Sequence, residues 1–443
     1  MNRILSNVML AAITSFASIG VLGAFDLDRP GQQPETRTIT VQDAVRMALT
    51  HAPEVLLADA QVIRAREAVR ETRSLNRPQV YTGTGLAYNN GYPLSMEGAA
   101  PSIFQVSGSQ AIFSKKNSNL IREAEESGKA SRFGADSVRN ELASRTALAY
   151  YQLYKSRQQI QIASDREAET IKEQEQVETL SAAGRVLHVE VTVAHNAVIS
   201  ARNQLRKAQE QANLAEMELR ELTGLPGTVS IKTVEPRIEN PAFNMQGLAL
   251  YQQALECTPE ILQSQANVKA KEYHVEAEKG ESLPKAEIIS EYAVFSKTNH
   301  YEDFFSRFSR HNYIVGLSLQ VPIFNGFRTS SRVAQSRQEV SEARNRLESL
   351  KRDLKLSIER SLSEVRNAQD DSDLAHSDAE LAREMLQVKG ALLEAGRIGP
   401  KEMGESRSTL QQKELAQLEA DQVLFQRKLE LLRVAGTLAS ALQ

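Results

Sequence analysis

Two carboxylates near the end of the chain have the spacing of an ion-binding pair. Glu402 and Glu405 follow a helix break at Gly396 and are three residues apart, so a helix places both on one face. Several copies of such a pair around one axis would concentrate cations, and their like charges would repel each other. The alternative is that both are ordinary solvated charges of a helix.

Other candidates for chemistry carry weaker signals. His188 and His195 are seven residues apart on one expected helix, but no third metal ligand accompanies them. The run of Asp370, Asp371 and Asp373 lacks the turn glycine and terminal acid of a calcium loop. No nucleophile, base and orienting group recur in a motif. We therefore expect neither an enzyme nor a metal or cofactor site, and interpret these residues as solvated or packing side chains.

The composition indicates that long helices position these residues. The 443 residues include only 22 Gly and 13 Pro, which are clustered, and no Trp, while Ala, Glu, Gln, Arg, Ser and Leu dominate. The formal net charge of −3 is spread along the chain without a basic block. A nucleic-acid partner is therefore not expected.

The first 24 residues have the pattern of a secretory signal peptide. Arg3 precedes an apolar run over 4–22, small residues follow, and the polar sequence over 25–39 is typical of an extended leader. An uncleaved anchor is the alternative, and the cleaved bond stays open. The single cysteine, Cys257, allows no disulfide within one chain and no acylation of an N-terminal cysteine. No later run of about eighteen apolar residues exists, so a mature chain that spans a membrane would do so with strands.

A strand and a long helix meet at a sharp junction in the second half of the chain. Apolar residues alternate with small and polar ones from Tyr313 onward, which predicts a strand over 313–324, long enough to cross a bilayer at a tilt. An uninterrupted helix is expected to follow over 328–394, roughly 100 Å in length. Between them, a proline removes a ladder donor and an Asn-Gly pair supplies turn chemistry. The junction residues are Pro322, Phe324, Asn325 and Gly326.

The chain contains a tandem repeat. Pro53 and Pro259, each in the sequence Ala-Leu-x-x-x-Pro-Glu, differ by 206 positions, and the helix-breaking Gly184 and Gly396 differ by 212. We expect a first copy over 40–225, a linker over 226–245 and a second copy over 246–437. The alternative is that two coiled-coil regions share only their composition.

Each copy is expected to contain a short helix, a second helix, a β-hairpin, a long helix, a break and a further helix. The first copy has strands at about 80–88 and 103–113, a long helix over 114–181, a tip over 182–187 and a helix over 188–222. The second has strands at about 286–295 and 313–324, a long helix over 328–394, a tip over 395–399 and a helix over 400–436. The second copy holds one extra residue between its last strand and its tip. Because one residue rotates a helix face by about 100°, we expect the junction to absorb it.

Four strands per chain have a consequence for assembly. A barrel with a filled or open interior needs eight or more strands, and every strand edge in a membrane must be paired. The chain is therefore expected to form oligomers. Long helices with modest apolar stripes suit side-by-side packing in a wall around a wet lumen.

At this point the sequence resembles the TolC-type outer membrane efflux proteins over nearly all of its mature length. The marks are Val321-Pro-Ile-Phe-Asn-Gly-Phe-Arg328, the two Ala-Leu-x-x-x-Pro-Glu motifs and the paired Ala-Gly-Arg breaks. The resemblance implies a mainly α fold with membrane β structure. Three copies would build a long α-helical coiled-coil barrel in the periplasm, continued by a 12-stranded outer-membrane β-barrel with four strands per protomer. The expected location is the outer membrane of a Gram-negative bacterium, with a large periplasmic part.

The resemblance also implies a function and partners. The homotrimer would be a passive exit duct of a tripartite efflux pump or a type I secretion system. Its partners would be outer-membrane lipid, a periplasmic membrane-fusion adaptor and an inner-membrane transporter of the RND or ABC type. The residues expected at the adaptor-docking tips are Gly184, Arg185, Gly396 and Arg397.

The resemblance gives the acidic residues a role at the tunnel entrance. Glu402 and Glu405 match an acidic pair that lines the closed entrance in that family, and Glu190 is the matching acid of the first copy. The sequence departs from the best-known pattern, with Leu393 and Ile398 where a gating Tyr and Arg would fall. We hypothesise instead that Arg185 and Arg397 tie the carboxylate ring.

Several alternatives stay open. A periplasmic adaptor also has long helical hairpins, although it would have one hairpin between β-domains, and a coiled-coil protein without a pore is a further class. The cargo is undecided between a small drug and a secreted protein. In the loop over 296–312, Phe304, Phe305 and Phe308 could form an aromatic girdle or fold inward as a plug.

Overall fold

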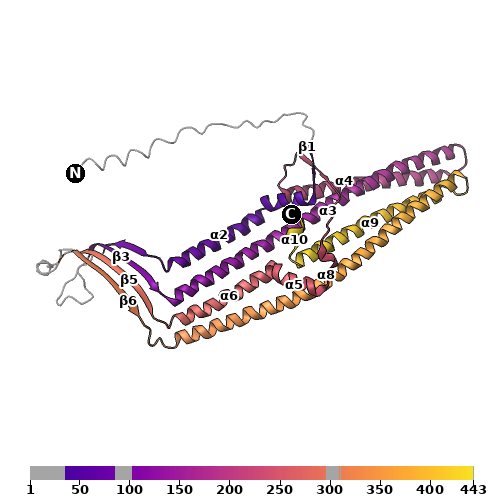
Figure 1. Cartoon of the computed structure of the whole chain (residues 1–443). Helices are drawn as coiled ribbons and strands as arrows, with labels where there is room; N and C mark the ends of the chain where they lie inside the picture. Colours follow the sequence, from indigo (N-terminus) through magenta and orange to yellow (C-terminus); the bar gives the residue numbers. More distant parts are fainter. Residues whose placement is uncertain (1–34, 85–101, 296–308, 310, 443) are drawn as a thin grey trace, which may run out of the picture.

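The computed structural model describes residues 35–84, 102–295, 309 and 311–442. The molecule is elongated, with a curved four-stranded sheet at one end and two helical hairpins at the other (Figure 1). The expected signal peptide, the leader before residue 35, the end of the strand expected to reach Tyr88, and the phenylalanines at 304, 305 and 308 lie outside the described residues.

The element order follows the two copies of the repeat. The first copy contains α1 (Val41–His51), α2 (Pro53–Ser74), β2 (Gln79–Gly83), β3 (Ser102–Phe113), α3 (Lys115–Ala182) and α4 (His188–Thr223). The second contains α5 (Gly247–Cys257), α6 (Pro259–Gly280), β5 (Lys285–Phe295), β6 (His311–Gln320), α8 (Arg328–Glu394) and α9 (Pro400–Val434). The remaining elements are β1 (Glu35–Ile39), β4 (Val229–Thr233), the 3₁₀ turn η1 (Pro241–Asn244) and α10 (Leu438–Leu442).

Local chemistry sets where the helices begin. Thr40 caps α1 with a capping box, because its hydroxyl accepts a hydrogen bond from the Asp43 amide and the Asp43 side chain returns to the Thr40 amide. Pro53 and Pro259 stand in the first turns of α2 and α6, where a missing N–H costs nothing. These starts agree with the sequence-based expectation.

Four helix ends have a backbone conformation that requires glycine. Gly184, Gly224, Gly396 and Gly436 all have a left-handed backbone, with φ between 69° and 71°. At Gly184 the next amide, that of Arg185, bonds the carbonyl of Leu180, which closes a Schellman cap. A residue with a Cβ is strained in this conformation, so the same residue type recurs at each break.

Three features of the elements differ from the sequence-based expectation. The last strand, expected over 313–324, ends at Gln320, because its partner Lys285 is the first residue of β5 and Pro322 has no N–H to donate. The end of the leader forms β1, which pairs in parallel with β4. A short helix, α10, follows Gly436. Neither pairing across the chain nor docking of a terminal helix leaves a local sequence signal.

The extra residue of the second copy lies at the strand-to-helix junction, as expected. In the first copy α3 begins two residues after Phe113, whereas in the second α8 begins four residues after Phe324. The two long helices have 68 and 67 residues, so the difference is nearly all outside them. The helix faces of the two copies therefore stay equivalent.

The elements form a wall one layer thick. The sheet order is β2-β3-β5-β6, all antiparallel. Next to it the helices pack in the order α2-α3-α6-α8, and beyond the middle of the molecule in the order α4-α3-α9-α8 (Figure 1). Each level therefore has four elements, two of which are at open edges.

The largest apolar cluster lies at the waist, where β1 and β4 cross the helices. Tyr150 of α3 is fully buried there, and its one hydroxyl hydrogen is shared between the carbonyls of Ile39 and Val234, while the oxygen accepts from the amide of Val234. One side chain thus joins the long helix to the leader strand and to the linker. Among the described residues, none of the helices combines the length and the apolarity needed to cross a membrane.

Candidate functional site

The sheet has one mostly apolar and one mostly polar face. The register places Tyr313, Val315 and Leu317 of β6 in line with Tyr292, Ser290 and Ile288 of β5. The three β6 side chains are 68% to 79% exposed, so the apolar face is not covered by the chain itself. Exposed apolar residues at every second position are the pattern of a lipid-facing strand.

Polar groups meet on the opposite face. Gln105 of β3 donates a hydrogen bond to Glu291 of β5, with 2.8 Å between nitrogen and oxygen. Gly316, Ser318 and Gln320 of β6 share this face because side chains alternate along a strand. A two-faced sheet of this kind can separate lipid from water.

The strand-to-helix junction is exposed and tightly turned. Pro322 and Phe324 lie in the irregular segment after β6, and Gly326 and Phe327 both have left-handed backbones, with φ of 64° and 63°. Such a conformation costs energy in a residue with a bulky side chain. The side-chain amide of Asn325 donates a hydrogen bond to the hydroxyl of Thr329 in the first turn of α8, and this bond holds the turn.

Aromatic and aliphatic side chains project from this junction. Phe324 is 76% exposed, Phe327 is 72% exposed, and their rings meet edge to face at 5.6 Å. Phe113, the counterpart of Phe324 in the first copy, is 53% exposed. Aromatic rings at this level are typical of an interface between membrane and water.

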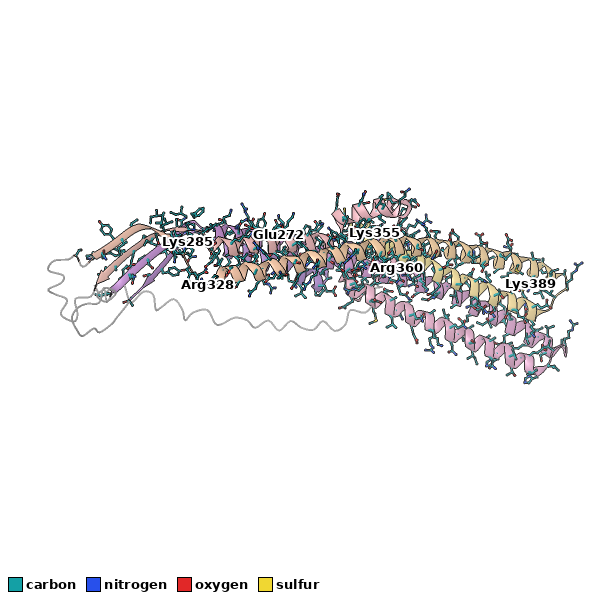
Figure 2. The ribbon with its side chains drawn as sticks, turned by 90° about the horizontal axis from the view of Figure 1, so that it is seen from below. Glu272, Lys285, Arg328, Lys355, Arg360 and Lys389 are labelled. Carbon is teal, nitrogen blue, oxygen red and sulfur yellow. The ribbon has the colours of Figure 1, made fainter. Side chains whose placement is uncertain are left out.

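A charged cluster fixes the helices beneath the sheet. Lys116 of α3 forms an ion pair with Glu281, and Arg328 of α8 lies within 3.9 Å of the same carboxylate. The hydrogen bond from Lys116 holds the pKa of Glu281 below its ordinary value. Figure 2 shows Arg328 and Lys285 at this boundary between sheet and helices. Gly280 lets the end of α6 approach α3, because an added Cβ would lie 2.6 Å from the Lys116 amide nitrogen.

The two tips lie at the far end of the wall. A Cβ added to Gly184 or Gly396 would meet no atom within 4 Å, so both turns are open to solvent. The side chains of Arg185 and Arg397 are exposed and form no ion pair with any described residue. In Figure 2, Lys389 marks this end of α8.

The three candidate carboxylates lie on the first turns beyond the tips. Glu190 and Glu402 each stand in the first turn of a helix, α4 and α9, where a negative charge is stabilised by the helix dipole. This position alone accounts for the match of these two residues between copies. Glu405 lies in the next turn, where the dipole effect is smaller, and both α9 carboxylates are exposed and form no ion pair with any described residue.

The structure instead brings together a polar seam that the sequence did not reveal. Arg407 of α9 lies 2.6 Å from one carboxylate oxygen of Glu173 of α3 and 3.8 Å from Glu169. Arg166 of α3 lies 3.6 Å from Glu173. These residues join the two hairpins just beyond the tips. The carboxylate partner of Arg407 lies more than 230 positions away, and it can be identified only once the rotation of α9 against α3 is known. The sequence therefore carries no local signal for this contact.

A buried lysine continues this seam toward the waist. The side chain of Lys155 is 7% exposed and donates to Glu419 and Gln422 of α9. The contact between α3 and α9 therefore includes ion pairs along two stretches. The contact between α3 and α4 combines small apolar residues such as Ala201 and Ala208 with the ion pairs Arg157–Glu216 and Arg202–Glu167. Ion pairs hold two helices together while permitting exchange of partners.

The two edge helices carry apolar residues that the chain leaves uncovered. On α8 these are Leu374, Leu381, Met385 and Val388, all more than half exposed. On α4 they are Val189, Val193, Leu214 and Met217, at 60% to 65% exposure. Both sets follow the three-and-four spacing of a coiled-coil seam.

The histidines and aspartates considered for metal binding do not form a site in the described part of the chain. His188 and His195 are exposed on α4, and Asp370, Asp371 and Asp373 are exposed on α8. No group of three His, Cys, Asp or Glu side chains with suitable geometry occurs among the described residues.

Comparison with protein families gives a match over most of the chain. The family model described as outer membrane efflux protein matches residues 44–225 and 250–437, one match for each copy. A relative, the pyoverdine export outer membrane protein OpmQ of Pseudomonas aeruginosa, is 27% identical over 259 residues. The match covers 57% of this chain and about half, 51%, of that relative.

Solved structures share the fold. The CmeC outer membrane channel of Campylobacter jejuni superposes with a TM-score of 0.74 at 15% identity, covering 90% of this chain and 86% of that one. The outer membrane protein VceC of Vibrio cholerae gives a TM-score of 0.73 at 15% identity, covering 89% and 96%. The two-copy wall with its sheet at one end is therefore a fold seen in outer-membrane channels.

Proposed function

Because the chain belongs to the outer membrane efflux protein family, a family of outer-membrane channels and not of enzymes, we propose that three copies of it form one continuous exit duct. The sheets of the three copies close a 12-stranded barrel in the outer membrane. The helices close a tunnel through the periplasm. Substrate passes through this duct without chemical change.

The observation that carries this proposal is the pair of open edges at every level of the wall. The sheet ends in β2 on one side and β6 on the other, and the helix layers end in α2 or α4 on one side and α8 on the other. The two edges differ, so a copy joins the next one head to tail, and a rotation that closes gives a ring. A membrane sheet tolerates no unpaired edge.

The charges of the edge helices support the same pairing. Lys207 lies midway along the exposed face of α4, and Asp371 lies at a similar distance from the tip on α8. Neither forms an ion pair with a described residue of its own chain. An α8 edge set against the α4 edge of the next copy therefore buries the two apolar seams and brings opposite charges close.

The tips form the entrance of this duct. Glu402 and Glu405 of three copies create a ring of carboxylates, and Arg185 and Arg397 of neighbouring copies tie it. The Arg407–Glu173 seam holds the two hairpins of one copy in the closed arrangement. Breaking that seam lets the α8–α9 hairpin swing away from α3.

The partners follow from the same role. A duct without its own energy source works with an inner-membrane transporter, of the RND or ABC type, and with a periplasmic adaptor that seals the join. The open turns at Gly184 and Gly396, with Arg185 and Arg397 beside them, offer the docking surface for the adaptor. A tripartite efflux pump is favoured over type I secretion, because the relative OpmQ exports a small molecule, pyoverdine.

The proposal is tested by ion conductance in planar bilayers. The purified protein should give discrete channels that multivalent cations block from the entrance side. The double variant Glu402→Ala, Glu405→Ala should lose most of this block because the carboxylate ring is gone. The variant Asp353→Ala, which removes an exposed acid in the middle of α8, is the matched control and should keep it.

Two results would contradict separate parts of the proposal. Unchanged block in the double variant would show that these carboxylates do not line the entrance. A complete lack of channels, in protein whose outer-membrane insertion is confirmed by heat-modifiable mobility, would contradict the duct itself.

A further inference from the structure

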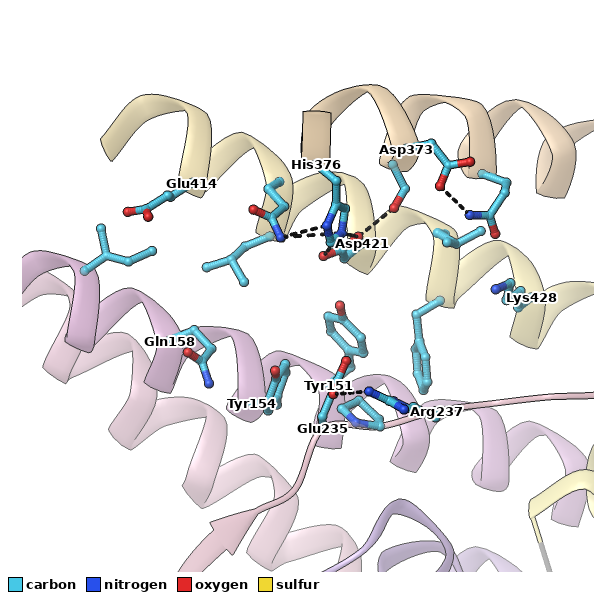
Figure 3. A pocket seen from close by; sticks show the side chains of 18 of the residues that line it. Tyr151, Tyr154, Gln158, Glu235, Arg237, Asp373, His376, Glu414, Asp421 and Lys428 are labelled. Atoms are coloured by element: carbon cyan, nitrogen blue, oxygen red, sulfur yellow. Dashed lines mark hydrogen bonds and ion pairs between the residues drawn. The ribbon is translucent and has the colours of Figure 1, made fainter. Parts of the chain in front are cut away.

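A hollow of about 930 Å³ lies between the two hairpins near the waist. Its walls come from α3, α8 and α9, and the linker after β4 crosses one side, at Glu235 and Arg237 (Figure 3). The volume falls in the range of small-molecule sites. The trimer contacts proposed above use the outer faces of α4 and α8, so the hollow is not one of them.

Aromatic rings form the floor of the hollow. Tyr151 packs on Phe425 with ring centroids 4.6 Å apart and meets Tyr154 edge to face at 5.9 Å. Edge-to-face and tilted rings of this kind offer negative faces to a positive charge.

Tyr151 presents a hydroxyl to the hollow that no other described residue uses. It is only 6% exposed, yet its hydroxyl makes no hydrogen bond with any described residue. The neighbouring Tyr150 makes three such bonds through its hydroxyl. In Figure 3 the Tyr151 ring lies between Asp421 on one side and Glu235 on the other. The ring is buried, whereas the hydroxyl oxygen is open to the hollow and is therefore available to a ligand.

The hollow has a negative charge. Seven carboxylates line it against three Lys or Arg side chains, a formal excess of four negative charges. Asp421 accepts from the hydroxyl of Ser372 at 2.7 Å and contacts the His376 ring nitrogen at 2.9 Å, and a carboxylate has room for further donors. At one end Lys428 is half-buried, and burial lowers its pKa while Asp373 and Asp421 oppose that change. The site thus already holds one amine among its acids.

These carboxylates are too dispersed for a bare metal ion. No group of three possible ligands meets in metal geometry among the described residues. Glu235 pairs with Arg237, and Glu414 pairs with Arg383, which spaces the remaining acids along the hollow. An extended ligand with several positive groups fits such spacing better than a point charge.

We propose that this hollow binds an organic polyamine through a primary ammonium group. The ammonium donates hydrogen bonds to the Tyr151 hydroxyl and the Asp421 carboxylate, over the faces of Tyr154 and Phe425. A second amine reaches the acids at the other end, near Glu380. The binding needs only α3, α8, α9 and the linker of one chain, so it does not depend on the proposed duct.

The test is calorimetric titration of the purified full chain with spermidine at low ionic strength. Saturable binding of one spermidine per chain is expected, and a neutral diol of the same length should not bind. Tyr151→Phe keeps the ring and removes the hydroxyl, and it should weaken binding about tenfold, as should Asp421→Asn. Asp353→Asn, an exposed acid of α8 outside the hollow, should leave the affinity unchanged.

Three outcomes would overturn the proposal. One is no saturable binding of spermidine to the folded protein. Another is equal affinity in the parent and in Tyr151→Phe, with thermal unfolding confirming that the variant is folded. The third is displacement by Mg²⁺ at the concentration expected for simple screening, because that would assign the binding to diffuse charge rather than to the hollow.

Discussion

Single side chains show where sequence reasoning reached the candidate site and where it stopped. Glu190 and Glu402 could be singled out because the repeat places an acid six residues after each glycine of a break, and Glu405 because it follows Glu402 by three residues. Their role at the entrance stays a prediction. Arg407 and Glu173 could not be found, because their contact depends on how α9 is rotated against α3. Ion pairing of Arg185 and Arg397 with the carboxylate ring stays a prediction, since these pairs would form between different copies of the chain.

Glu281 provides a pH-dependent prediction at the same scale. The hydrogen bond from Lys116 lowers the pKa of Glu281 below its ordinary value of 4.5. The ionised carboxylate of Glu281 therefore stabilises the folded protein at neutral pH, and this stabilisation is lost as the pH falls through the lowered pKa. Glu281→Gln should reduce the free energy of unfolding by about 1 kcal/mol at pH 7 and by much less near pH 3.

Thermal unfolding of the purified protein at the two pH values measures this difference. Glu210→Gln is a suitable control, because Glu210 forms an exposed pair with Arg206 on α4 and should change stability little at either pH. An equal loss at both pH values in Glu281→Gln would mean that packing, and not the ion pair, is responsible.

At the scale of elements, most helices and strands were predictable because their signals are local. Thr40, Pro53 and the glycines of the breaks carry cap chemistry, and the alternation from Tyr313 carries strand chemistry. The strand β1 was missed, since its partner β4 lies nearly two hundred residues away. The early end of β6 also depends on its partner, because β5 begins at Lys285.

Two glycines with the same backbone conformation give a matched prediction about helix ends. Gly396 and Gly436 have φ of 70° and 71°. A Cβ added at Gly436 would lie 2.7 Å from the backbone of Cys257, whereas a Cβ added at Gly396 would meet no atom within 4 Å. Gly396→Ala should cost about 1 kcal/mol of backbone strain. Gly436→Ala should cost about 2 kcal/mol more, because the end of α9 must move away from the junction between α5 and α6.

Chemical denaturation of the two variants in parallel provides the comparison. Similar losses in both would contradict the close approach at Gly436. A larger loss at Gly396 would indicate that the tip turn is packed in the assembled protein, as it would be beneath a neighbouring copy.

At the scale of the whole molecule, the sequence predicted a mainly α chain with membrane strands, and the family and the fold confirm this. The order of elements in the wall could not be predicted, because it is set by contacts between α3 and α6 and between α3 and α9 that span the two copies. That order identifies the unlike edges, α4 and α8, on which the account of the duct depends.

Cross-linking between these edges tests the central claim most directly. In a Cys257→Ser background, one chain would carry Val193→Cys on α4 and Val388→Cys on α8, two exposed positions at similar distances from the tips. A short bismaleimide applied to outer-membrane fractions should give covalent trimers, and each single-cysteine chain should stay monomeric. Products that stop at dimers, or dimers from a single-cysteine chain, would contradict a closed head-to-tail ring of three copies.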